Sequence, residues 1–181
     1  MAALATIRPA EALFPDLPVT IGQVELRRES LADEAFLRRL YRSTREDELG
    51  ITGWPDPVKQ SFCDRQFALQ HAHYRKHHPD GEFLVLRSGL EPVGRLYLAD
   101  DGAAIHLVDI AVMPLWRGRG IGSALLAALQ QRAAMAGKAV CLNVLSWNRR
   151  AMALYGRFGF VASGVDGAHL AMRWCNGDRF S

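Results

Sequence analysis

The sequence predicts a single domain of the α/β (α+β) class, in which one mixed β-sheet carries helices on both faces. The chain has 181 residues, of which 49% are hydrophobic and 23% charged, enough apolar surface for one sizeable core. Its expected elements follow the order strand, two helices, three strands, helix, strand, helix and two strands. Helices on both sides of a shared sheet are the usual arrangement for such an order.

The first part of the chain changes character near residue 23. Residues 1–22 contain three prolines and a glycine (Pro9, Pro15, Pro18 and Gly22), so we expect an irregular lead-in that lies over the domain. Residues 24–28 alternate in polarity, which predicts a strand. Ser30 is a helix-capping residue, and the apolar spacing after it predicts a helix to about Arg45.

A second helix and a run of strands come next. Pro55 and Pro57 suit the first turn of a helix, which we expect to end at the Pro79-Asp80-Gly81 turn. Residues 82–87 and 92–98 then read as a hairpin with a turn at Ser88-Gly89, and residues 104–113 as a longer strand. We expect these neighbouring strands to pair antiparallel.

The last third alternates helix and strand. Three leucines at helical spacing predict a helix over about 120–136, followed by a strand at 139–145 and a helix at 148–158. Strands near 160–163 and 169–174 close the chain. We therefore expect a lead-in at 1–22, one domain at 23–175 and a tail at 176–181.

Charge is distributed unevenly along the chain. The stretch from Ile110 to Val165 contains no Asp or Glu but seven basic residues: Arg117, Arg119, Arg132, Lys138, Arg149, Arg150 and Arg157. Such a stretch predicts an anionic ligand. Because small and apolar residues separate the basic ones, we expect a compact phosphorylated ligand and no nucleic acid.

Several classes of protein are disfavoured. The longest run without a charged residue is twelve, Gly120 to Gln131, and a membrane-spanning helix needs about 20. The apolar residues at 1–7 lack a basic leader, so we expect a cytoplasmic protein with no membrane partner. Three separated cysteines, and a His73–His77 pair without a helically spaced acid, predict no metal site.

The segment 112–123 lies where an expected strand passes into an expected helix. It contains alternate glycines at 118, 120 and 122, which let a ligand approach the backbone. The free amides at a helix N-terminus hold phosphate, and Arg117 and Arg119 add positive charge. The segment fits neither a Walker loop nor a dinucleotide fingerprint. The alternative is a glycine-rich turn that only allows close packing.

Two motifs resemble those of one enzyme family. Arg117, Gly120 and Gly122 match the pattern Arg/Gln-X-X-Gly-X-Gly/Ala, and residues 148–160 match Asn-X-X-Ala-X-X-Leu-Tyr-X-X-X-Gly-Phe. Together they resemble the GCN5-related N-acetyltransferase (GNAT) family, over about Val24 to Cys175. The resemblance implies a mostly antiparallel central sheet of six to seven strands and acetyl-CoA (CoA) as cofactor.

The same resemblance implies a cofactor site. The pyrophosphate would lie on the amides from Arg117 to Ser123, and the pantetheine arm along the strand before the loop. Asn148 would cap its helix or touch the pantetheine. The implied contacts are Ile110, Ala111, Val112, Arg117, Gly118, Arg119, Gly120, Ile121, Gly122, Ser123, Asn148, Ala151, Tyr155 and Arg157.

Catalytic roles are also implied. Tyr155 would protonate the departing thiolate, although its helical spacing also suits a packed core aromatic. The base for the acceptor amine stays open. His106 lies where several relatives carry a catalytic Glu, or is a histidine on a sheet face without a chemical role. Asp109 is a second candidate, or a buried residue that anchors the sheet, and Glu46 and Glu48 lie where relatives build the wall of the acceptor site. Asn143 departs from relatives that carry a Glu there.

The sequence thus predicts transfer of acetyl from acetyl-CoA to an amine of a small molecule or of a protein or peptide, by direct attack in a ternary complex. The alternative is a non-catalytic acyl-CoA sensor. Trp54, Gln66, Gln70 and His73 are candidates for the acceptor pocket. The acceptor and the oligomeric state, a homodimer included, stay open.

Overall fold

The computed structural model describes residues 13–177, and within them eight strands form one sheet. The elements in chain order are β1 (Val19–Ile21), β2 (Val24–Arg28), the 3-10 helix η1 (Leu31–Asp33), α1 (Glu34–Thr44), α2 (Glu46–Gly50), α3 (Asp56–His77), β3 (Glu82–Ser88), β4 (Glu91–Asp100), β5 (Ala104–Val112), the 3-10 helix η2 (Pro114–Trp116), α4 (Ile121–Met135), β6 (Ala139–Leu145), α5 (Arg149–Arg157), β7 (Val161–Asp166) and β8 (His169–Trp174). The strand order is β1-β2-β3-β4-β5-β6-β8-β7. Every pair is antiparallel except β5 with β6.

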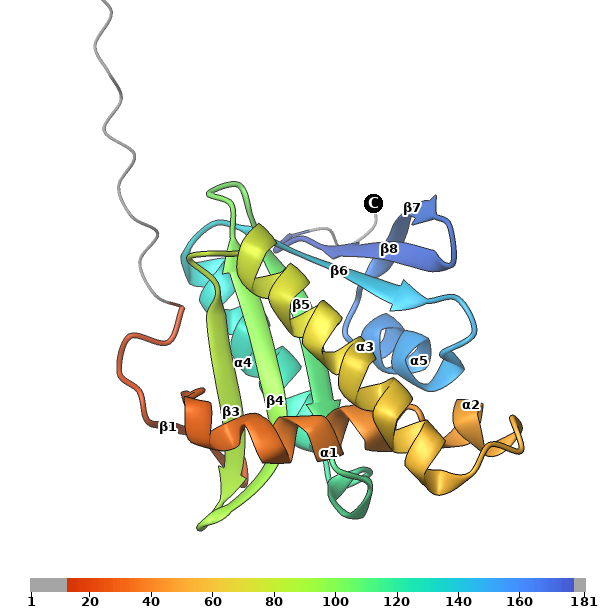
Figure 1. Ribbon diagram of the computed structural model, residues 1–181. Helices are drawn as coiled ribbons and strands as arrows, with labels where there is room; N and C mark the ends of the chain where they lie inside the picture. Colours follow the sequence, from red (N-terminus) through yellow and green to blue (C-terminus); the bar gives the residue numbers. More distant parts are fainter. Residues whose placement is uncertain (1–12, 178–181) are drawn as a thin grey trace, which may run out of the picture.

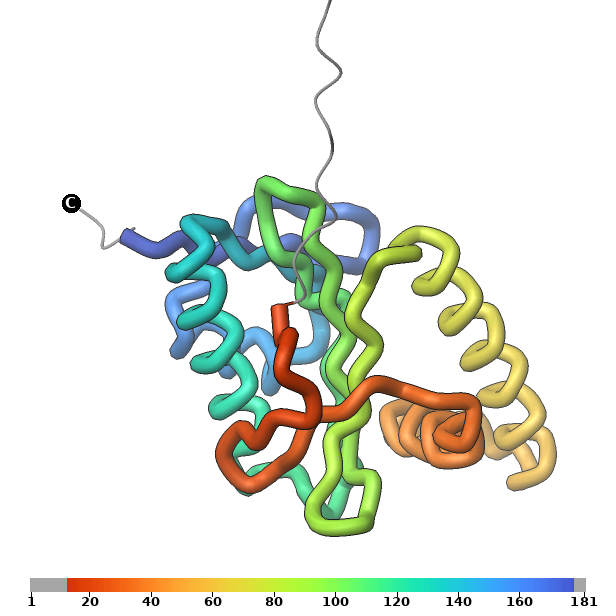
Figure 2. Tube along the Cα trace, turned by 90° about the vertical axis from the view of Figure 1, so that its left-hand side faces the viewer, coloured from red at the N-terminus to blue at the C-terminus, as the bar shows by residue number. Residues whose placement is uncertain are grey.

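The sheet separates two layers of helices. Helices α1 and α3 cross one face, while α4 and α5 cover the other (Figure 1). Figure 2 shows the sheet with α3 and α4 on opposite sides of it. The expected mixed sheet with helices on both faces is therefore confirmed. None of the described helices has the length and apolar character needed to cross a membrane.

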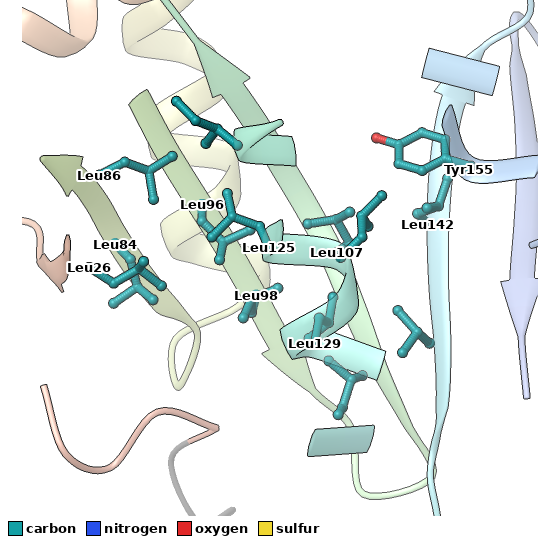
Figure 3. Packing of buried hydrophobic residues seen from close by; sticks show 14 of the residues in the cluster. Leu26, Leu84, Leu86, Leu96, Leu98, Leu107, Leu125, Leu129, Leu142 and Tyr155 are labelled. Carbon is teal, nitrogen blue, oxygen red and sulfur yellow. The ribbon is translucent and has the colours of Figure 1, made fainter. Parts of the chain in front are cut away.

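The larger core lies between the sheet and α4. Leucines from β2, β3, β4 and β5 meet Leu125 and Leu129 of α4, and Tyr155 lies at the β6 end of this cluster (Figure 3). The predicted inward face of α4 is confirmed, since Leu125, Leu126 and Leu129 are each 1% exposed. Removal of this apolar surface from water is the main stabilising contribution on this side of the sheet.

A smaller core fills the other face. Phe36, Leu37 and Leu40 of α1 and Phe67 of α3 pack on Val85 and Ala111 of the sheet. Because α3 lies over the middle strands, its inner face determines which polar side chains of β4 and β5 remain accessible.

The pairing of β5 changes halfway along the strand. On one side, β5 pairs with β4 throughout, with a bulge at Val108 that lies between the pairs Leu98–Leu107 and Tyr97–Asp109. On the other side, β5 pairs with β6 only through residues 104–107 and 139–142. Beyond them the two strands part. We call the space between residues 108–112 of β5 and 143–145 of β6 the β5–β6 opening.

Besides the 3-10 helices η1 and η2, the structure adds one strand and one α-helix that we did not expect. β1 lies within the lead-in that we expected to be irregular, where it pairs with β2, and Phe14 is buried at 1% exposure. The polar segment after α1 forms the short helix α2. The sheet accordingly has one strand more than the six to seven expected. The other predicted elements agree with the structure, apart from small differences at their ends.

Candidate active site

The segment between β5 and α4 forms a loop with free amides. Gly118 and Gly120 have φ values of +79° and +82°, a region that favours glycine. A β-carbon at Gly120 would meet no atom within 4 Å, so this face of the loop is open. The first turn-forming bond of α4 runs from the Ala124 amide to the Gly120 carbonyl. Amides 118–123 donate no hydrogen bond within residues 13–177.

Arg117 differs from its expected role. Its amide donates to the Pro114 carbonyl at 3.1 Å. Its guanidinium donates from Nε to the Val112 carbonyl at 2.9 Å and from Nη2 to the Ser43 carbonyl at 3.1 Å. Arg117 therefore fastens the loop to the end of β5 and to α1, and the row of free amides begins one residue later than predicted.

Other basic side chains near the loop are arranged differently. Arg119 lies over the Trp116 indole, 4.8 Å from the ring centroid, and its carbonyl accepts from Gln23 Nε2 at 2.6 Å. Arg157 is in the last turn of α5, at the opposite end of that helix from Asn148. The structure thus does not bring Arg157 to the loop.

Sequence reasoning missed Arg150 as a residue of this site. A β-carbon at Gly118 would lie 3.9 Å from Arg150 Nη2, so this guanidinium lies against the loop. The sequence signal was only its membership of the basic stretch, because the motif match points to the small and apolar residues around it.

Asn148 has the first of its two predicted roles. Its Oδ1 accepts from the Ala151 amide at 3.1 Å, which caps α5. Ala151 itself packs on the larger core.

The β5–β6 opening exposes one edge of β5. Its residues 109–112 pair with 94–97 of β4 on one side, and on the other side no strand within residues 13–177 pairs with them. Ile110 and Val112 pack toward the α4 core, whereas Ala111 packs under α1 and α3. An edge of this kind leaves backbone groups free to pair with an extended ligand.

Tyr155 is both a core residue and a site residue. It is 7% exposed and packs its ring against Phe160 at 5.8 Å between centroids. Its hydroxyl makes no hydrogen bond within the described chain and points toward β5 (Figure 3). Burial, with a smaller effect of Asp109, raises the pKa of Tyr155 to about 12.

Asp109 lies on β5 where the opening begins. It forms an ion pair with Arg95 of β4, which is 3% exposed and also donates to Gln70 Oε1 at 2.9 Å. The charge of Asp109 contributes to the raised pKa values of both Tyr74 and Tyr155. The Asp109 charge therefore acts on the Tyr155 hydroxyl, with no hydrogen bond between the two side chains in the described chain.

The other candidate bases lie elsewhere. His106 Nε2 is 2.7 Å from Asp101 Oδ2, and His106 pairs in register with Cys141 in the closed part of the sheet. This hydrogen bond is the main cause that lowers the pKa of Asp101 to about 2. Glu46 is exposed on α2 without an ion pair among the described residues, and Glu48 pairs with Arg45 at 3.1 Å.

Asn143 follows the last β6 residue that pairs with β5, and it is exposed. It is therefore the first β6 residue of the opening. An amide there can donate or accept a hydrogen bond but cannot take a proton.

The residues expected to shape the acceptor pocket differ in whether they face the sheet or solvent. Gln70 faces the sheet, through its bond to Arg95. Trp54 packs edge-on against Phe62 at 5.6 Å and is 41% exposed. Gln66 is half-buried, whereas His73 is exposed and stacks on His77 at 3.9 Å. The structure thus supports Gln70 as a site neighbour and leaves His73 on the outer face of α3.

A comparison with protein families covers the residues of this site. The model of the acetyltransferase (GNAT) family matches residues 36–160, more than half the chain and all of the loop, the opening and Tyr155. The chain belongs to this family, so the resemblance seen in the motifs is confirmed. By family it is an acetyltransferase.

Individual relatives agree in fold. The chain is 44% identical over 59 residues to the thialysine N-epsilon-acetyltransferase of Bos taurus, a match that covers 32% of this chain and only 35% of that protein. The PaiA N-acetyltransferase of Thermoplasma acidophilum, solved with coenzyme A, superposes with a TM-score of 0.64 at 19% identity over 84% of this chain and 99% of that one. RimJ of Mycobacterium smegmatis, solved with CoA-disulfide, gives 0.59 at 22% identity over 91% of each chain.

Proposed function

We propose that this acetyltransferase transfers acetyl from acetyl-CoA to an amine nitrogen by direct attack within a ternary complex. The observation that carries the proposal is the β5–β6 opening, which has the loop of free amides at one end and Asp109 at the other, with the Tyr155 hydroxyl pointing toward β5. The short match to a thialysine N-epsilon-acetyltransferase supports an amine acceptor.

The chain's residues suit the cofactor. Amides 118–123, without partners in the described chain, would hold the pyrophosphate at the positive end of α4. The free edge of β5 at residues 110–112 would pair with the pantetheine arm. Bound acetyl-CoA supplies the acetyl group as a thioester.

Tyr155 would act as the general acid. When the amine nitrogen forms its bond to the carbonyl carbon, the carbon–sulfur bond breaks and its electron pair goes to sulfur. Tyr155 gives its proton to that sulfur and is reprotonated from solvent. A pKa of about 12 keeps the hydroxyl protonated throughout the neutral range.

Asp109 would receive the proton that the attacking amine loses. It lies at the start of the opening, and its charge is one cause of the raised pKa of Tyr155. His106 is three residues back along β5, roughly 10 Å at the usual strand rise, and it is hydrogen-bonded to Asp101. The Arg95 ion pair would hold the Asp109 carboxylate in position.

The test of the function is acceptor-dependent release of CoA. Incubation with acetyl-CoA and a panel of primary amines, small molecules and peptides, should release free thiol with one acceptor class and give an acetylated product by mass spectrometry. Intersecting initial-velocity lines would support direct attack, and parallel lines would contradict it. Saturable CoA binding without release for any amine would favour a sensor.

Two variants test which residue is the general base. Both are assayed with the acceptor identified in the amine panel. We expect Asp109→Asn to lower kcat/KM by about 10²-fold or more. His106→Gln, which removes a titratable group on the same face of β5, should retain activity within a few-fold. The reverse ranking would assign the proton to His106.

A further inference from the structure

We propose that Arg150, on the first turn of α5, supplies the side-chain positive charge of the pyrophosphate site. This inference rests on the proposed binding of CoA at the loop. It concerns a residue outside the motif positions, contributed by a different helix from the one that follows the loop.

Helices α4 and α5 lie side by side in the same direction. Near their beginnings, a β-carbon at Gly118 would be 3.9 Å from Arg150 Nη2, and one at Gly122 would be 3.4 Å from Leu154 Cδ2. Further along, Gln130 Nε2 donates to the Phe158 carbonyl at 2.6 Å. Each contact advances along both helices, so the two N-termini lie at the same end.

This arrangement adds a second positive helix end beside the loop. α5 has nine residues and an Asn148 cap that uses the Ala151 amide. The positive end of its dipole and the Arg150 guanidinium would act on the same anion as the α4 amides.

The other two loop arginines each have a protein partner, a pair of carbonyls for one and an aromatic ring for the other. Arg117 donates to the Val112 and Ser43 carbonyls, and Arg119 stacks on Trp116. Arg150 has neither a hydrogen bond nor an ion pair in the part of the chain that the structure describes. No carboxylate occurs between Ile110 and Val165 to compete for it.

The contact at Gly118 also specifies which phosphate is involved. Gly118 begins the row of free amides, so a guanidinium against it would meet the pyrophosphate, which CoA and dephospho-CoA share. A role at the 3′-phosphate would distinguish the two ligands. The planar guanidinium can give two parallel hydrogen bonds to one phosphate group.

The experiment measures binding of CoA and of dephospho-CoA by calorimetry to the parent, Arg150→Gln and the matched control Arg149→Gln. The control removes the same charge from the adjacent residue. We expect Arg150→Gln to raise both dissociation constants by roughly tenfold, and Arg149→Gln to change them less than twofold. Arg150→Lys should recover part of the loss, and higher salt should shrink it.

Three results would overturn the inference: equal effects of the two Gln variants, a loss confined to CoA, or no loss in Arg150→Gln. Melting temperatures of all variants verify that each is folded. Failure of the parent itself to bind CoA would instead contradict the proposed function, so the two failures are distinguishable.

Discussion

Tyr155 combines a buried ring with a hydroxyl that faces the β5–β6 opening. The ring belongs to the larger core, and burial raises the pKa of the phenol from 10 to about 12. The same burial therefore stabilises the fold and keeps the proton available.

Substitution Tyr155→Phe separates these two roles, because it removes only the hydroxyl. We expect the affinity for CoA to be unchanged and kcat to fall by about 10²- to 10⁴-fold. Calorimetry and steady-state kinetics measure the two quantities. A parental kcat would make Tyr155 a core residue only.

The raised pKa of Tyr155 also predicts the shape of the pH profile. The acid must be protonated, and its pKa of about 12 lies above the ordinary value of 10. Activity should therefore show no decline due to this phenol as pH rises to 10. The pH profile of the parent is compared with that of the residual activity of Tyr155→Phe. If the parent loses activity near pH 10 and the variant does not, the prediction is contradicted.

The site residues differ in how far the sequence could identify them. The motif spacing located the loop and Tyr155, because alternate glycines and an aromatic at fixed spacing leave a local pattern. Arg117 and Arg150 have the same residue type and the same acid-free surroundings, but only packing decides which one faces the loop. The ion pair of Asp109 with Arg95 joins two strands, so no pattern in the local sequence predicts it.

At the scale of elements, helix α4 has one glycine at each end, and the two can be compared directly. Gly120, at its beginning, and Gly137, after its end, have φ values of +82° and +67° with open space around them. A glutamate is equally strained at either position, but only at Gly120 would its carboxylate occupy the phosphate site.

We therefore expect Gly120→Glu to weaken CoA binding roughly hundredfold or more, by charge repulsion and loss of space. Gly137→Glu should bind CoA like the parent while it loses similar stability. Calorimetry and thermal melts measure both. Parental affinity in a folded Gly120→Glu variant would remove the loop from the cofactor site.

The 3-10 helix η1, which leads into α1, is held by one carboxylate. Asp33 is 4% exposed; it accepts from the Ser30 amide and hydroxyl at 2.8 and 2.9 Å and pairs with Arg27. The hydrogen bond from Arg27 is the largest cause that lowers the Asp33 pKa to about 2. A carboxyl whose pKa is depressed on folding stabilises the protein above its unfolded pKa, near 4.

Asp33→Asn should consequently lower the free energy of unfolding by about 1–2 kcal/mol at pH 7. The difference from the parent should shrink below pH 4 and be lost as pH falls through 2. Urea denaturation across this range measures it. Asp64→Asn, which removes the half-exposed partner of Arg38, should cost less than about 0.5 kcal/mol. Equal losses in both variants would contradict the assignment.

The helices and strands were largely predictable where the sequence shows a regular spacing of apolar residues and has turn-forming residues at the ends of the element. α3 has prolines at its beginning and a Pro-Asp-Gly turn at its end, and β6 ends where expected. β1 and α2 have three and five residues, too short to establish a period. β1 forms because β2 offers it a free edge, which is a tertiary contact.

For the whole molecule, the cofactor would connect parts that the fold leaves separate: the loop, the free edge of β5 and the first turn of α5. Binding to the folded state alone stabilises it by about 2.7 kcal/mol at a ligand concentration of 100 Kd. We expect CoA at that level to raise the melting temperature by roughly 5–10 °C. The Gly120→Glu variant should show almost no shift, and an equal shift there would mean that CoA binds elsewhere.

The short pairing of β5 with β6 has a mechanical consequence. Four residues on each strand join the five-stranded part of the sheet (β1 to β5) to the three-stranded part (β6 to β8), and they do so at one end only. The two parts also share α4, which packs on both β5 and β6. α4 in turn contacts α5, at Gly122 against Leu154 and at Gln130 against Phe158. The angle between the two parts, and with it the width available to an acyl group, therefore depends on how α4 packs across the sheet and against α5.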